Sequence, residues 1–184
     1  MGLRIARIHS KTPRMTSILA PVREQKGSPM KSLINVVYAS RATEEFHEHE
    51  IPELLKQARL ANAAHQLTGM LLYIAGAFVQ VLEGEAEPVE TAVETIRGDK
   101  RHHQIRVISK DSILERAFEG WTMSHKTLDP AEAGELIGED EYFLSPTWIQ
   151  ALDSNRAQKL LSAASTQWQM ERRIGKYRTL GRSA

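Results

Sequence analysis

The sequence predicts an α+β fold, a ferredoxin-like sandwich in which two helices cover one face of a mixed β-sheet. Short apolar runs alternate with longer helical patterns in the order βαββαββ, and two adjacent runs are joined by a short connection that contains glycine. The C-terminal part continues with apolar residues at helical spacing, so further helices are expected to pack on the sheet. With 184 residues, 41% of them hydrophobic, the chain can form one domain with appendages.

The first strand is expected at residues 33–40, LINVVYAS, which are rich in β-branched side chains. Acidic residues and two histidines follow, and a helix then begins at Ile51-Pro52, because proline is tolerated in the first turn. Apolar side chains recur at helical spacing from there to about His65.

The next two strands, residues 67–74 and 78–82, flank the connection Ala75-Gly76-Ala77 and form a hairpin. Since side chains alternate along a strand, Gln80 shares a face with two apolar neighbours. A buried amide without a partner costs about 1–3 kcal/mol, so Gln80 needs protein backbone, a water or a bound polar ligand. Strand alternation alone does not decide which face is buried, so Gln80 could also lie on a solvent-facing side of the strand.

The rest of the βαββαββ pattern lies between residues 83 and 124. We expect Glu83-Gly84-Glu85 to turn the chain, and a second amphipathic helix to follow and to end near Gly98. The fourth strand is expected at Gln104–Ser112 and the fifth at Glu119–Ser124.

Beyond Leu128 the pattern is helical. A short helix is expected at 131–137, and Ser145-Pro146 is typical of an N-cap followed by proline in the first turn. Trp148 and the Leu160-Leu161 pair are expected to dock on the open face of the sheet. From about Met170 the sequence predicts a frayed basic tail.

The charge is unevenly distributed, although the formal net charge is only +1. Residues 1–31 and residues 154–184 each carry seven Lys/Arg and one acid, so the central part is strongly acidic. An acidic body makes direct binding of nucleic acid unexpected, while the basic ends are either solvated tails or contacts for an anionic partner. Residues 1–31 are expected to be disordered, a transit peptide, or a misannotated extension that precedes a true start at Met30.

Several classes of site are excluded by composition. The chain has no cysteine, which excludes disulfides, thiolate metal sites and a cysteine nucleophile. No apolar run approaches the roughly 20 residues that a membrane span requires. Two histidine pairs, His47/His49 and His102/His103, lack a third ligand, so no metal site is expected. No nucleophile–base, phosphate-loop or dinucleotide motif supports an enzyme.

Other polar and aromatic residues are candidates for a site, although each also has an ordinary structural explanation. Tyr38 lies in the middle of a strand, and Asn62 interrupts the apolar pattern of the first helix. Trp121 and Met123 are expected on one face of the fifth strand with His125, where core packing explains them equally well. A polar cluster that follows the second helix suits phosphate recognition or a solvated loop: Asp99, Arg101, His102 and His103.

Taken together, these pieces resemble a BLUF domain, a blue-light sensor that uses FAD. The resemblance extends over about residues 33–128, and its pieces occur in the family's order and spacing: 36–40 (VVYAS), 58–62 (ARLAN), 67–73 (LTGMLLY), 76–84 (GAFVQVLEG), 99–103 (DKRHH) and 116–123 (RAFEGWTM). Each piece is weak alone, whereas the ordered set is specific.

The resemblance implies a flavin between the two helices. FAD is expected, with FMN or riboflavin as alternatives. The ring would lie near Tyr38, Asn62 and Gln80; Leu54, Leu71 and Ile96 would form its walls; and Asp99, Arg101 and His102 would approach the ribityl and phosphate part. Ala61 and Thr95 stand where some members have polar or basic side chains, so one ring contact and one phosphate contact are missing.

The resemblance also implies a mechanism. Blue light would excite the oxidised flavin, an electron and then a proton would leave Tyr38, and Gln80 would rotate or tautomerise to give a red-shifted signalling state. Trp121 and Met123 would compete for the place beside Gln80 and pass the change to the C-terminal helices. No substrate would be turned over, so we expect a photosensory flavoprotein rather than an enzyme.

The expected organisation is a flavin-binding domain at 32–128, a helical extension at 129–169 and a basic tail at 170–184. The 56 residues after Leu128 cannot hold a cyclase or phosphodiesterase domain, so output is expected through a downstream protein partner that contacts the helices and the tail. A bacterial, cytoplasmic homo-oligomer is expected. The alternatives are a flavin-dependent redox enzyme and a light-insensitive ferredoxin-like interaction module.

Overall fold

Five strands form one mixed sheet in the order β4-β1-β3-β2-β5. A computed structural model describes the backbone of residues 32–180 and the side chains of residues 32–172, so our predictions for residues 1–31 and for the end of the tail lie outside it. The strands are β1 (Leu33–Ala42), β2 (Thr68–Ile74), β3 (Ala77–Glu85), β4 (His102–Ile113) and β5 (Ser124–Leu128).

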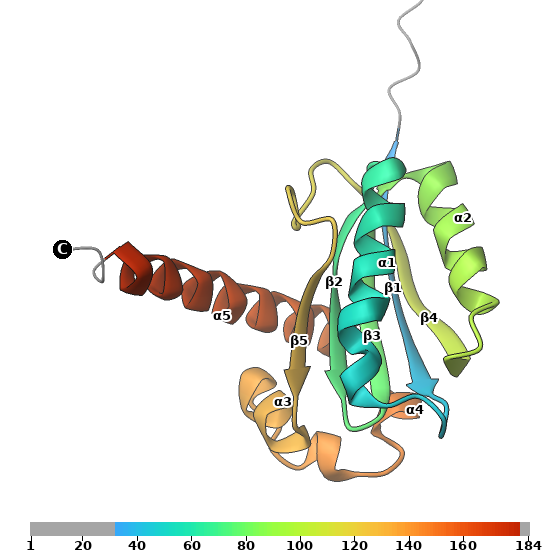
Figure 1. The fold of residues 1–184 in the computed structure, drawn as a ribbon. Coiled ribbons are helices and arrows are strands. Elements are labelled where there is room, and N and C mark those ends of the chain that lie inside the picture. The colour runs from blue at the N-terminus through green and yellow to red at the C-terminus, as the bar shows by residue number, and fades with distance from the viewer. Residues whose placement is uncertain (1–31, 181–184) are drawn as a thin grey trace, which may run out of the picture. The chain divides into compact units, whose positions relative to one another are not determined.

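Helices cover both faces of this sheet, and α1 (Ile51–Ala64) and α2 (Ala86–Arg97) lie together on one of them (Figure 1). The other helices are η1 (Glu48–Glu50), α3 (Pro130–Ile137), η2 (Tyr142–Leu144), α4 (Trp148–Ala151) and α5 (Ser154–Leu180). The predicted α+β sandwich of the ferredoxin-like type is confirmed. None of the helices in the described part of the chain is long and apolar enough to cross a membrane.

The register of the central strands places the candidate residues side by side. Tyr38 of β1 pairs directly with Gln80 of β3, and Gln80 pairs on its other side with Leu71 of β2. The hairpin between β2 and β3 turns at Ala75 and Gly76, both with positive φ (45° and 78°), as a two-residue turn that matches the twist of the strands requires. The hairpin prediction is therefore confirmed.

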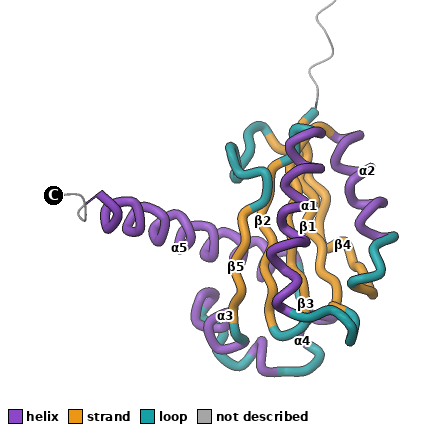
Figure 2. The backbone as a smooth tube through the Cα atoms, viewed as in Figure 1, coloured by secondary structure: helices purple, strands orange, loops and turns teal. Residues whose placement is uncertain are grey.

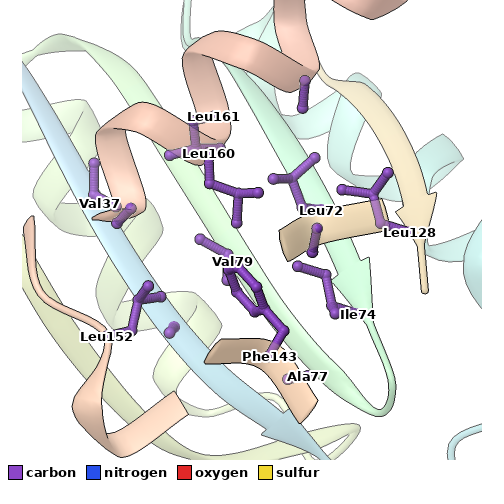
Figure 3. Packing of buried hydrophobic residues seen from close by; sticks show 14 of the residues in the cluster. Val37, Leu72, Ile74, Ala77, Val79, Leu128, Phe143, Leu152, Leu160 and Leu161 are labelled. Carbon is purple, nitrogen blue, oxygen red and sulfur yellow. The ribbon is translucent and has the colours of Figure 1, made fainter. Parts of the chain in front are cut away.

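The alternation of side chains produces two separate cores. Between the sheet and α1/α2 lies a first core, which includes Tyr38, Leu71 and Phe78. The second core lies on the opposite face, where Leu160 and Leu161 of α5 pack against strand residues such as Val79 (Figure 3). The predicted docking of α5 and of Trp148 on the sheet is confirmed. Because both faces are covered, Gln80 is only 7% exposed, and a solvent-facing position is excluded.

The fifth strand was predicted wrongly, because β5 begins at Ser124 and not at Glu119. Residues 114–123, the connecting segment, link β4 to β5 as a loop (Figure 2), with Gly120 at a φ of 76°. The buried carboxylate of Glu83 accepts hydrogen bonds from the amides of Ala117 and Phe118, so these donors are satisfied without a neighbouring strand. We predicted a strand here because the aromatic residues of the connecting segment have high strand propensity.

Other boundaries also differ from the prediction, and three of these differences change how a segment is interpreted. Glu83-Gly84-Glu85 is the end of β3 and not a turn, since β1 pairs with it along its whole length. The N-cap of α4 is Thr147, two residues after the predicted Ser145. Helix α5 continues to Leu180, so the backbone from residue 170 to 180 is helical where a frayed tail was expected.

Candidate functional site

A cavity of about 310 Å³ lies between α1, α2 and the sheet, within the size range of small-molecule sites. Its walls are mainly apolar, and polar groups stand at its floor and at one end. All nine residues that we expected beside a cofactor line it: Tyr38, Leu54, Asn62, Leu71, Gln80, Ile96, Asp99, Arg101 and His102.

On the floor of the cavity, the Tyr38 hydroxyl donates a hydrogen bond of 2.5 Å to Oε1 of Gln80. Direct pairing of β1 and β3 brings these side chains together. Burial, and secondarily the negative charge of Asp99, raises the pKa of Tyr38, so the phenol keeps its proton at neutral pH. Among the described residues, no protein atom accepts a hydrogen bond from Nε2 of Gln80, and this donor remains available to a bound group.

At one wall, α1 contacts the connecting segment. Nδ2 of Asn62 donates to the carbonyl of Thr122 at 2.5 Å, and Nε of Arg59 donates to the carbonyl of Met123 at 2.9 Å. The two α1 residues are three apart, so they project from the same side of the helix. Our sequence reasoning missed Arg59; its spacing from Asn62 was the available signal.

The polar end of the cavity is organised by an ion pair. Two guanidinium nitrogens of Arg101, Nε and Nη2, contact the Asp99 carboxylate, with Nη2 at 2.5 Å from Oδ2, and Nη1 donates to Gln57 at 3.1 Å. Burial alone would raise the pKa of Asp99, but the hydrogen bonds and charge of Arg101 outweigh it and hold that pKa below its ordinary value. The cluster therefore presents a fixed, partly neutralised guanidinium.

His102 belongs to the same end of the cavity, where Nδ1 lies 2.9 Å from Oγ of Ser40. Burial lowers the pKa of His102, and the charge of Asp99 only partly opposes this effect. A neutral imidazole at pH 7 follows, in which one ring nitrogen donates a hydrogen bond and the other accepts one.

Trp121 and Met123 do not share a face, contrary to the strand that we predicted there. Met123 is 3% exposed and packs in the core beneath α1 and α2. Trp121 packs against the core on the α5 side, where its ring centroid lies 4.4 Å from that of Trp168 and 5.9 Å from that of Phe118. Neither residue lines the cavity.

The buried Glu83 is a second feature that sequence reasoning missed. Its carboxylate accepts from the amides of Ala117 and Phe118, at 3.1 and 3.0 Å, and from the Thr68 hydroxyl at 3.3 Å. Burial raises the pKa of Glu83, although these hydrogen bonds oppose the shift. The carboxylate thus fixes the connecting segment against the end of β3.

The cavity suits a flat aromatic ring system with an anionic extension. Leu54, Leu71 and Ile96 offer apolar surfaces, and the free Nε2 of Gln80 offers a hydrogen bond at the edge of the floor. Arg101 at the far end suits a phosphate. In the described part of the chain, no three acidic or histidine side chains are grouped so as to hold a metal ion.

Comparison with known proteins connects this chain to one family. The model of the BLUF family, sensors of blue-light using FAD, matches residues 33–124. Photoactivated adenylate cyclase subunit beta of Euglena longa is 33% identical over 97 residues, which are 52% of this chain and 11% of that protein. Subunit alpha of the Euglena gracilis enzyme is 34% identical over 86 residues, 47% of this chain and 8% of that protein. The chain therefore spans about a tenth of the length of these curated relatives.

Solved structures agree with the family match. The photo-activated state of BlsA superposes with a TM-score of 0.61 at 29% identity and covers 71% of this chain and 92% of that chain. The dark state of BlrB, a BLUF protein, gives a TM-score of 0.57 at 26% identity and covers 74% of this chain and 98% of that chain. The likeness thus extends past the residues that the family model matches.

Proposed function

The chain belongs to the BLUF family, the sensors of blue light using FAD, and from this membership we propose that it is a photoreceptor that switches through Tyr38 and Gln80. One observation carries the proposal: the buried phenol of Tyr38 donates to Oε1 of Gln80, while the amide nitrogen of Gln80 has no protein acceptor among the described residues. A flavin in the cavity would supply that acceptor.

The proposed flavin site uses the side chains that line the cavity. Leu54, Leu71 and Ile96 would hold the ring, and Asn62, which also lines the cavity, would contact its polar edge. Arg101, with Asp99 and His102, would approach the ribityl and phosphate part. A second phosphate contact from α2 is absent at Thr95, so FMN or riboflavin competes with FAD more readily than where a basic residue occupies that position.

When bound, the flavin supplies absorption of blue light and an acceptor for one electron. Tyr38 is the donor in our proposal, because its hydroxyl lies on the cavity floor and already holds a hydrogen bond along which its proton can leave. The electron and the proton return to Tyr38 once Gln80 has exchanged the places of its amide oxygen and nitrogen, so no net oxidation remains. The Tyr38–Gln80 pair consequently has two hydrogen-bonded arrangements, which is the bistable element that a switch needs.

We further propose that the signal leaves through the connecting segment. Asn62 joins the cavity to this segment, and Trp121 joins the segment to Trp168 of α5. The flavin-binding domain is residues 32–128, and the helices that follow present the contact for a downstream protein. Turnover of a substrate is not part of this function, and assembly into a homo-oligomer in the cytoplasm remains a prediction.

An absorption spectrum of the purified protein before and after blue light tests the proposal. We expect a flavin spectrum that shifts reversibly to longer wavelength, and no such shift in Gln80→Leu. Gln150→Leu, an exposed amide on α4, is the matched control and keeps the shift. Protein without flavin, or Gln80→Leu with a normal shift, contradicts the proposal. Steady oxidation of NAD(P)H without a photocycle would instead indicate a redox enzyme.

A further inference from the structure

We propose that Arg59 is a positioning residue of the photocycle, which holds the backbone of Met123 and so keeps Met123 and Trp121 on opposite faces of the sheet. This inference rests on the proposed function, since it concerns how the cavity communicates with α5. The proposed role belongs to Arg59 of α1, a side chain that does not line the cavity.

Three successive carbonyls of the connecting segment are held by three separate donors. The carbonyl of Trp121 accepts from the amide of Gly69 at 2.9 Å. Asn62 binds the next carbonyl at 2.5 Å, and Arg59 binds the carbonyl of Met123 at 2.9 Å. Peptide planes fixed at consecutive positions leave this stretch of backbone little freedom, so the direction of each side chain is determined.

The three donors are not equivalent. The Gly69 amide belongs to β2, where the strand approaches β3 so closely that a side-chain carbon at this position would overlap the carbonyl of Val81. Asn62 lines the cavity, so a bound group can compete for its amide. Two of the three donors are side chains, and of these only Arg59 lies out of reach of a ligand in the cavity. The bond from Arg59 therefore persists when the bond from Asn62 changes.

The surroundings of Arg59 keep its guanidinium committed to this carbonyl. His125 of β5 is a titratable group close enough to Arg59 to sense its charge, and burial, with a smaller contribution from Arg59, lowers the pKa of His125 to about 4. The imidazole is therefore neutral at pH 7 and does not repel the guanidinium. A charged donor to a carbonyl forms a stronger hydrogen bond than a neutral one.

The bond from Arg59 to the carbonyl of Met123 affects side chains on both faces of the sheet. Met123 stays in the core beside the cavity, and Trp121 stays against Trp168 of α5. Without the bond from Arg59, the last of the three carbonyls is free, and the segment can rotate about the remaining two contacts. The position of Arg59 thus sets how readily α5 responds to the cavity.

The test compares Arg59→Ala with Arg59→Lys in the full-length chain loaded with flavin, and uses Lys56→Ala as a matched control. Lys56 is an exposed cation on the same helix whose described contact is an ion pair with Glu53. The first readout is hydrogen exchange of the Gly69 amide in the dark, which reports directly on its bond to Trp121. We expect exchange to be roughly tenfold faster in Arg59→Ala, near normal in Arg59→Lys and unchanged in Lys56→Ala.

The second readout is the rate at which the red shift decays in the dark. Because the Arg59 bond persists while the bond from Asn62 changes, it guides the segment back to its dark position, so we expect Arg59→Ala to decay roughly threefold to tenfold more slowly, with flavin binding and the size of the shift unchanged. Normal Gly69 exchange in Arg59→Ala, or a decay rate equal to that of the control, overturns the inference. If the unsubstituted protein shows no red shift, the proposed function fails, while the exchange measurement still decides whether Arg59 holds the segment.

Discussion

Replacement of Glu83 tests whether a buried carboxylate, rather than strand pairing, holds the connecting segment. In Glu83→Gln the amide oxygen can accept from one backbone N–H, but the amide nitrogen faces the other donor. An unsatisfied buried donor costs about 1–3 kcal/mol, so we expect Glu83→Gln to lose about 1–2 kcal/mol of unfolding free energy.

Glu83→Ala removes the acceptor from both amides and from the Thr68 hydroxyl. Ala117 is exposed, so water can satisfy its amide, whereas the Thr68 hydroxyl, which only accepts from Arg116, loses its acceptor. The loss therefore exceeds that of Glu83→Gln but does not triple it, and we expect about 2–4 kcal/mol.

Urea unfolding, followed by far-ultraviolet circular dichroism with a common m-value, measures both losses. Glu119→Gln is the control, because this exposed carboxyl lies in the same segment, and we expect it to stay within about 0.5 kcal/mol of the unsubstituted protein. Near-ultraviolet dichroism of the Trp121–Trp168 pair should change in the Glu83 variants as the segment loosens. Glu83→Ala with unchanged stability would refute this account of the segment.

Two further predictions concern the photochemistry and the response to pH. Tyr38→Phe removes the proposed electron and proton donor, and we expect it to bind flavin but to form no red-shifted state; a normal photocycle in this variant would exclude Tyr38 as the donor. His125 has a pKa of about 4 in the folded chain, below its unfolded value, so its contribution to stability is complete above pH 6.5 and is lost as the pH falls to about 4. The loss amounts to at most about 3 kcal/mol. His125→Gln should flatten this part of the stability–pH curve, whereas the exposed His49→Gln should leave it unchanged; equal curves would show that His125 is not the group responsible.

Local patterns and the resemblance to the BLUF family together made much of the cavity predictable. Side-chain alternation assigned Tyr38 and Gln80 to defined faces of two strongly apolar strands, and the resemblance implied that these faces, with Leu71, meet at one site, as the strand register shows. Helix periodicity placed Leu54 and Ile96 on inward faces. These are local patterns of period 2 and 3.6, which is why short stretches of sequence suffice to read them.

The connecting segment could not be predicted in this way. Its backbone bonds go to Glu83, Gly69, Asn62 and Arg59, which are 34 to 64 residues away in the chain. No local period encodes such contacts, and the aromatic residues of the segment have high strand propensity whether or not a strand forms. Arg59 and Glu83 were overlooked for the same reason, because their partners are backbone atoms of a distant loop.

By itself, the sequence determined the α+β sandwich and the order of its elements, because both depend on repeating local patterns and on a turn that only certain residues form. The meeting of Tyr38 with Gln80 was implied by the resemblance to the BLUF family, and the strand register places the two residues opposite each other. Only the tertiary structure decided that Met123 lies with the cavity and Trp121 with α5. That choice depends on which distant donors hold three consecutive carbonyls, and the chain must be folded before those donors and carbonyls meet.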